Sequence, residues 1–148
     1  MSTIAIPDGA RLAIDTSAFI YYLEQHPHYR TVADELFRRI EAGRLTACAS
    51  VLLLTELLVP YYRVGDNARA AGVSRGVRTM RNLSVLPTSE VIAERAALLR
   101  GKYGLRSPDA LHVATGLHDG AEWFVTNDSK LKRVAAENLK VWLFDENV

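Results

Sequence analysis

Four acidic residues are spaced so that a folded chain could bring them together: Asp15, Glu56, Asp109 and Asp128. They are separated by roughly 20 to 50 residues, the distance from one strand–helix unit to the next. Four neighbouring carboxylates repel one another and do not all ionise unless something positive lies among them. A hard divalent cation meets that need, and Mg²⁺ or Mn²⁺ fits better than zinc because the sequence has no Cys/His ligand cluster. Such an ion lowers the pKa of bound water, and a pair about 4 Å apart can hold both reacting oxygens of a phosphodiester.

The first of these acids, Asp15, follows a short apolar run, Leu12 to Ile14, that predicts a buried strand. Two hydroxyl residues, Thr16 and Ser17, come next, and a short helix is predicted over Ala18 to Leu23. In open α/β sheets ligands bind outside the carboxyl ends of the strands, so an acid at this position borders the binding crevice. Asp is also a good helix cap, and capping alone would explain its presence.

Glu56 has the weakest purely structural explanation of the four. It lies in the middle of a stretch that is apolar nearly all round, Val51 to Val59, with Ser50 as a fair cap before it. We expect this helix to pack on several sides, where an ionised carboxylate needs a cation, a proton or a water-filled cleft. Pro60 cannot donate to the carbonyl of Glu56, so a kink or the end of the helix is expected near the acid.

The other two acids occupy positions that local structure also explains. Asp109 follows Ser107–Pro108, which is typical of a capped helix start with an acid at the positive end of the dipole. Asp128 follows the predicted strand Trp123 to Thr126 and is by default a turn or cap residue. His112 lies one turn after Asp109, and a lone histidine there more often packs or forms a hydrogen bond, so it is left out of the predicted site.

The elements that must position these acids alternate between strand and helix, which favours a parallel sheet covered on both faces. Further strands are predicted over Leu45 to Ala49, Leu83 to Leu86 and Lys140 to Phe144. Further helices are predicted through Val32 to Ile40, over Ala68 to Asn82, from the cap at Pro87–Ser89 to near Gly101, over Ala110 to Leu117 and around Val134 to Ala136. In the helix through Val32 to Ile40, the charged residues Asp34, Glu35, Arg38 and Arg39 are expected on the solvent side.

Composition excludes several broad classes of protein. With 49% hydrophobic and 24% charged residues the 148-residue chain is typical of one globular domain, and no repeat, linker or low-complexity segment interrupts it. The net charge of +1 argues against a generally basic nucleic-acid coat, so any such contact must use a local patch. Cys48 is expected to be a small buried hydrophobe. No signal peptide is evident in Met1 to Arg11 and no apolar run approaches the ~20 residues of a membrane span, so we expect a cytoplasmic protein.

Taken in order, the segments around the four acids resemble those of the PIN-domain ribonucleases, and most closely the small VapC-like toxins of bacterial and archaeal toxin–antitoxin pairs. The matching segments are Ile14-Asp15-Thr16-Ser17, Thr55-Glu56, Ser107 to Ala114, and Phe124 to Asp128. They follow the family's order and spacing and span nearly the whole chain. Each fragment is weak by itself, whereas the ordered set is strong.

The resemblance implies a fold and an activity. The implied fold is a single domain over residues 1–148, a three-layer α/β/α sandwich on a sheet of about five mainly parallel strands. The implied activity is metal-dependent endonucleolytic hydrolysis of RNA, and such a toxin has an antitoxin protein as partner and usually forms a homodimer. The residues that would bind Mg²⁺ or Mn²⁺ and carry catalysis are Asp15, Glu56, Asp109 and Asp128.

The same resemblance implies roles for neighbouring polar residues. Thr16, Ser17 and Asn127 would order waters or the scissile phosphate. The candidates for contact with the RNA backbone or a protein partner are Arg75, Arg78, Arg81, Lys130 and Lys132. Some family members carry another acid two positions after the one that Asp128 matches. Lys130 stands there, which leaves the number of metal ions open.

Other functions stay open on the sequence. The chain could be a PIN-domain RNA-processing nuclease outside toxin–antitoxin systems, or a non-catalytic PIN-like module that binds RNA or protein. Phosphoryl transfer through Asp15 as nucleophile is a further alternative, although Ser17 stands where that chemistry usually has a second acid. A set of four helix caps is the purely structural alternative, and Glu56 is its main difficulty.

Overall fold

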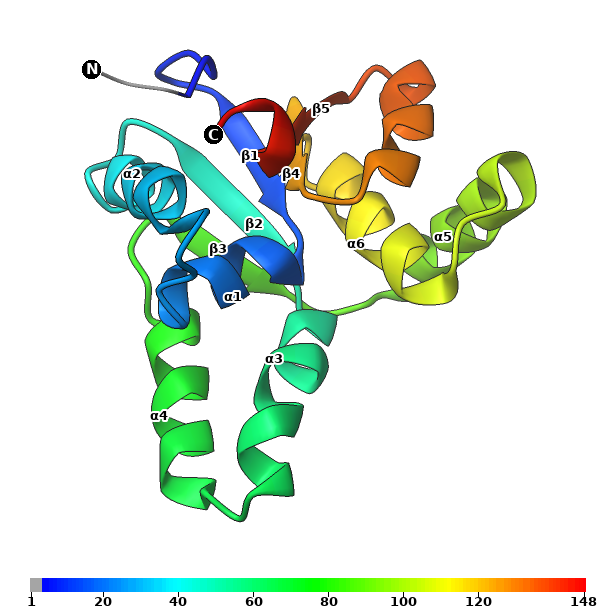
Figure 1. The fold of residues 1–148 in the computed structure, drawn as a ribbon. Helices are drawn as coiled ribbons and strands as arrows, with labels where there is room; N and C mark the ends of the chain where they lie inside the picture. Colours follow the sequence, from blue (N-terminus) through cyan, green and yellow to red (C-terminus); the bar gives the residue numbers. More distant parts are fainter. Residues whose placement is uncertain (1–3) are drawn as a thin grey trace.

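A parallel sheet forms the centre of the protein. Its strands are β1 (Arg11–Ile14), β2 (Thr46–Ser50), β3 (Leu83–Leu86), β4 (Trp123–Thr126) and β5 (Lys140–Leu143). The computed structural model describes residues 4–148, and within that range the sheet has the order β3-β2-β1-β4-β5 with every ladder parallel (Figure 1). Residues 1–3, predicted to belong to the single domain and to an N-terminus without a signal peptide, lie outside the described residues.

Helices cover both faces of this sheet. They are α1 (Thr16–Leu23), α2 (Arg30–Glu41), α3 (Leu52–Arg63), α4 (Asn67–Arg78), α5 (Glu90–Tyr103) and α6 (Ser107–His118), with 3₁₀ segments η1 (Ser129–Glu137) and η2 (Phe144–Glu146). Alternate residues of a strand face opposite sides. Leu12 and Ile14 of β1 pack in the core with α1 and α2, whereas Ala13 packs with α5 and α6. The predicted three-layer α/β/α sandwich is therefore confirmed (Figure 1).

The order of the strands places a crevice beside β1. From β1 the sheet grows through β2 to β3, and then on the other side through β4 to β5. Such a switch point leaves a ligand-binding crevice outside the carboxyl ends of the two central strands. The residues that directly follow β1 and β4, Asp15 and Asn127–Asp128, therefore border this crevice.

Helix α6 approaches β1 closely because it presents small side chains to the strand. Gly116 lies where a Cβ atom would collide with the Cβ of Ala13 on β1. Only glycine permits this approach, which brings the amino end of α6, with Asp109, close to the carboxyl end of β1. The glycine is thus part of what positions the acids.

The predicted surroundings of α3 are wrong. Only Leu53 and Leu57 of this helix are buried, and Val59 and Tyr62 are exposed. The helix also runs through Pro60 to Arg63, so of the two expected outcomes, a kink or a helix end, the helix end is wrong. In Figure 1 α3 and α4 form an antiparallel pair that extends away from the sheet, so much of the apolar surface of α3 stays uncovered. Because the helix is exposed around Pro60, the carbonyl that lacks a donor can be hydrated.

Two further predictions from local sequence are wrong. Arg39 and Glu35, expected in solvent, are buried. The guanidinium of Arg39 donates to the carbonyl of Ile6 at 2.7 Å and to Asp8 at 2.7 Å, because the N-terminal segment crosses α2. Helix α5, expected to end near Gly101, continues to Tyr103, and the C-cap Gly104, with a positive φ of 66°, closes it.

Two expectations about single features agree with the structure. Cys48 is buried, and its burial raises the pKa of the thiol to about 12, so it is an inert core residue. None of the helices within residues 4–148 is long and apolar enough to cross a membrane.

The close approach at Gly116 gives the first prediction. We expect Gly116→Ala to lower the free energy of unfolding by about 1–3 kcal/mol, because the new methyl group overpacks the helix–strand contact. Gly101→Ala, in α5 where a Cβ atom meets nothing within 4 Å, is the matched control and should raise stability by up to about 1 kcal/mol. Urea denaturation of both variants measures the difference, and equal stabilisation by both would contradict the proposed contact.

Candidate active site

A cavity of about 400 Å³ opens at the carboxyl ends of β1 and β4. All four predicted acids line it, each from a different segment of the chain: Asp15 after β1, Glu56 on α3, Asp109 on α6 and Asp128 after β4. The predicted neighbours Thr16, Ser17 and Asn127 line it as well. The structure therefore brings the predicted acids together around one cavity, while the roles assigned to them stay predictions.

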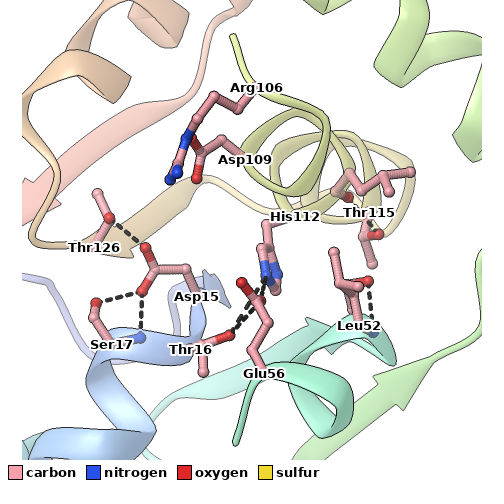
Figure 2. Close-up of polar contacts among 12 residues, drawn as sticks. Asp15, Thr16, Ser17, Leu52, Glu56, Arg106, Asp109, His112, Thr115 and Thr126 are labelled. Atoms are coloured by element: carbon pink, nitrogen blue, oxygen red, sulfur yellow. Dashed lines mark hydrogen bonds and ion pairs between the residues drawn. The ribbon is translucent and has the colours of Figure 1, made fainter. Parts of the chain in front are cut away.

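Asp15 is fixed on both of its carboxylate oxygens. Oδ1 accepts hydrogen bonds from the backbone N–H of Ser17 at 3.0 Å and from its hydroxyl at 2.5 Å, and Oδ2 accepts one from the hydroxyl of Thr126 (Figure 2). The acid is thus the N-cap of α1 as well as a cavity residue. Burial raises the pKa of Asp15, although the hydrogen bonds from Ser17 and Thr126 oppose that rise. A carboxylate with only neutral donors is costly here, and a nearby positive charge would relieve it.

Glu56 lies at the rim of the cavity with 37% of its side chain exposed, so the expected apolar burial is wrong. Its Oε1 accepts a hydrogen bond from the hydroxyl of Thr16 at 2.8 Å and lies 2.6 Å from Nε2 of His112. The hydrogen bond with His112 is the main cause that lowers the pKa of Glu56. Figure 2 shows the carboxylate between the two partners. The expected compensating group thus exists, and it is a residue that the sequence analysis left out.

Asp109 also has a partner that was not predicted. The Nε of Arg106 lies 3.1 Å from its Oδ2, and both side chains line the cavity. Arg106 precedes α6 as its N-cap, so Ser107 is the first helical residue and not the cap. The Asp109–His112 spacing of three contained the missed signal, because residues three apart share a helix face. Because Asp109 faces the cavity, His112, on the same face of α6, faces it as well.

The segment after β4 is held by its own hydrogen bonds. Asp128 is the N-cap of η1, and its Oδ1 accepts from the backbone N–H of Lys130 at 3.0 Å. The amide of Asn127 donates to the hydroxyl of Tyr21 at 3.1 Å and accepts from the N–H of Asp145 at 2.9 Å. Asn127 therefore ties α1 and the C-terminal segment to the cavity, and both ends of its side chain are already engaged.

The donor set of the cavity fits a hard divalent cation. It contains four carboxylates together with hydroxyl and amide oxygens, the ligands that Mg²⁺ and Mn²⁺ prefer. Among residues 4–148, however, no three His, Cys, Asp or Glu side chains are already close enough together to hold one ion. Two of the carboxylates are instead engaged by Arg106 and His112. The chemistry of the donors fits, and the carboxylates are not gathered into a finished cluster.

The predicted basic contacts fall into two groups. Lys130 lies beside the cavity, in a neighbouring pocket that it shares with Arg106 and Asp109. Lys132 is paired with Glu146 at the surface. The other three, Arg75, Arg78 and Arg81, lie in or just after α4, and none of them is among the described residues that line the acidic cavity.

Comparisons with known proteins agree with this fold. A family model described as PIN domain matches residues 12–137. VapBC2 from Rickettsia felis, solved with a promoter DNA fragment, has a TM-score of 0.67 at 20% identity over 90% of this chain and 98% of that chain. VapC20 from Mycobacterium tuberculosis, described as a sarcin–ricin loop cleaving toxin, has a TM-score of 0.66 at 16% identity over 84% and 95%.

A toxin–antitoxin complex from Klebsiella pneumoniae has a TM-score of 0.60 at 22% identity over 88% of this chain and 95% of that chain. At these identities the likeness shows a shared fold. A search of curated proteins finds no significant match.

The surroundings of Asp15 give a prediction about stability. A carboxyl group whose pKa is raised by folding destabilises the protein as the pH rises from its unfolded value, 3.8, through its folded value. Without metal, Asp15→Asn should therefore melt no lower than the parent, and its advantage should grow over that acidic range. Asp66→Asn, at the N-cap of α4, is the control, since Asn caps as well as Asp. Thermal melts from pH 3 upward measure the trend, and a large loss of melting temperature in Asp15→Asn would favour a purely structural role.

Proposed function

Because the chain belongs to the PIN domain family, we propose that it is a metal-dependent endoribonuclease and the toxin of a type II toxin–antitoxin pair. The observation that carries the proposal is the convergence of four carboxylates, from four separate segments, on one cavity at the switch point of the sheet. Solved structures that share the fold support the biological assignment, since they include a toxin–antitoxin complex and a toxin described as sarcin–ricin loop cleaving.

The proposed cofactor is Mg²⁺ or Mn²⁺. The residues that would hold it are Asp15, Glu56, Asp109 and Asp128. When bound, such an ion supplies a water molecule of lowered pKa and a positive charge next to the phosphate that is attacked.

The protein's own contribution is to hold the acids in place. The hydroxyls of Ser17 and Thr126 fix Asp15, and the hydroxyl of Thr16 helps to fix Glu56. The predicted role of Thr16 and Ser17 in orienting the phosphate thus becomes, in this proposal, a role in orienting carboxylates. Their hydroxyls already donate to the acids.

The RNA backbone needs cations at the mouth of the cavity. Arg106 is highly exposed there, and a guanidinium is suited to phosphate because it can donate two parallel hydrogen bonds. Lys130 lies next to it. We therefore assign the nearest phosphate contacts to Arg106 and Lys130. We propose that Arg75 and Arg78 of α4, together with Arg81 just after it, contact a protein partner.

A protein partner also fits the apolar surface of this half of the molecule. A groove of about 460 Å³ runs between α1 and α4, and its lining includes Tyr22, Leu23, Val73 and Met80. These side chains are half-buried, and Arg69 lines the same groove. A partner of mixed apolar and acidic character would cover such a surface. We propose that an antitoxin segment binds in this groove. We also propose that the protein is cytoplasmic and forms a homodimer.

The function has a direct test. Purified protein should cleave single-stranded RNA internally in Mg²⁺ or Mn²⁺, lose cleavage in chelator, and regain it when metal is added back. Asp15→Ala should abolish cleavage, because it removes a proposed ligand. Expression without a partner should arrest growth, and the same substitution should relieve the arrest.

Two results would distinguish the nuclease mechanism from the toxin assignment. Cleavage that survives both chelator and Asp15→Ala would refute the mechanism. A metal-dependent nuclease that does not impair growth would keep the chemistry and refute only the toxin assignment.

The salt dependence of RNA binding distinguishes the basic residues that contact RNA phosphates from those that contact a protein partner. Each lost phosphate contact should reduce the slope of log K against log salt by about 0.7 on single strands. Arg106→Ala and Lys130→Ala should each do so. Lys132→Ala is the matched control and should change the slope less, because this lysine lines neither the acidic cavity nor the neighbouring pocket. Replacing Arg75, Arg78 and Arg81 together should leave the slope unchanged and weaken the complex with a protein partner. A large loss of slope in that triple variant would instead assign these arginines to RNA.

A further inference from the structure

We infer that His112 is a positioning residue of the acidic site, which fixes one carboxylate oxygen of Glu56 and leaves the other for the metal ion. The inference rests on the proposed function, in which Glu56 is a metal ligand. His112 itself is no ligand in this arrangement and acts through Glu56. It is neither one of the proposed metal ligands nor one of the proposed phosphate contacts.

The geometry around Glu56 is asymmetric. Its Oε1 receives the hydroxyl of Thr16 at 2.8 Å and lies 2.6 Å from Nε2 of His112, and those two partners are 3.5 Å apart. Within residues 4–148 no hydrogen bond of the protein reaches Oε2. One oxygen is therefore held from two sides while the other stays available (Figure 2).

The burial of His112 determines which nitrogen carries the proton. Only 4% of the side chain is exposed, and its Nδ1 is buried without a hydrogen-bond partner among the described residues. A proton on Nδ1 would leave a buried N–H unpaired, which is costly, whereas a bare lone pair is less so. The ring therefore carries its proton on Nε2 and donates it to Glu56. This assignment makes His112 a directional hydrogen-bond donor.

Glu56 needs such a donor more than the other acids do. It lies on the exposed helix α3, and a glutamate has more rotatable bonds than an aspartate. Mutation of a residue that forms a hydrogen bond with a metal ligand, and so orients it, typically lowers metal affinity by about 10- to 100-fold. Helix α6 thus contributes twice to the site, through Asp109 directly and through His112 one turn later.

A packing role for His112 makes a different prediction from a positioning role. The orphaned Nδ1 costs stability, so for packing alone a leucine of similar size would serve as well or better. Under the positioning role, His112→Leu keeps or raises the melting temperature of the metal-free protein and weakens metal binding. Stability and metal affinity then move in opposite directions, which a loss of packing does not produce.

The experiment measures Mn²⁺ binding to the metal-free protein by isothermal titration calorimetry. His112→Leu should weaken binding about 10- to 100-fold. His112→Gln, whose amide can donate from a position near Nε2, should retain most of the affinity. His118→Leu, an exposed histidine at the end of the same helix, is the matched control and should bind Mn²⁺ as the parent does.

A double-mutant cycle shows whether His112 acts through Glu56. In a Glu56→Ala background, His112→Leu should cause no further loss of Mn²⁺ affinity, because its target is gone. In the metal-free parent, ¹⁵N NMR should show the His112 proton on Nε2, and its resonance should shift in Glu56→Ala.

Unchanged Mn²⁺ affinity in His112→Leu, or additive losses in the cycle, would overturn the inference and leave the proposed function intact. A parent protein that binds no Mn²⁺ would overturn both. A parent that binds Mn²⁺ and cuts no RNA would refute the nuclease alone.

Discussion

The need to hold four carboxylates around one cavity is the constraint on which the site depends. Each acid meets it in a different way: Asp15 accepts from hydroxyls and a backbone N–H, Glu56 from Thr16 and His112, Asp109 is paired with Arg106, and Asp128 caps η1. Burial still raises the pKa of Asp15. Local stability is thus given up at Asp15, as is common where a residue is placed for function.

The fold brings the four acids to one cavity with short connections. With β1 in the middle of a parallel sheet, the residues after β1 and β4 reach one edge without long loops. Gly116 then lets α6 lie against β1, which brings the amino end of that helix, with Asp109 and His112 on one face, over the same edge. Only Glu56 comes from a helix that extends away from the sheet, and its Oε1 is held there by Thr16 and by His112 of α6.

The features that could be predicted from the sequence are those that depend on residues close together in the chain. Strands β3 and β4 lie where they were expected because an apolar run between polar turns is a local signal. The burial of Arg39 depends on the segment Ile4 to Asp8, which lies more than 30 residues away, so no helical pattern could reveal it. The contact between His112 and Glu56, 56 residues apart, was hidden for the same reason, and only the spacing of three from Asp109 could have placed the histidine at the cavity. The opposite error arose at α3, whose apolar composition predicted burial that the α3–α4 pair does not provide.

A capping role and the proposed functional role, between which the sequence leaves a choice for Asp15 and Asp128, are compatible in this structure. Both residues cap the segment that follows them, and both line the cavity. An N-cap side chain accepts from the first backbone N–H groups of its helix, and at the end of a parallel strand those groups lie beside the crevice. A carboxylate that caps there is therefore already placed and oriented for a ligand. Capping fixes the acid in the position where it can function, so the two roles support each other.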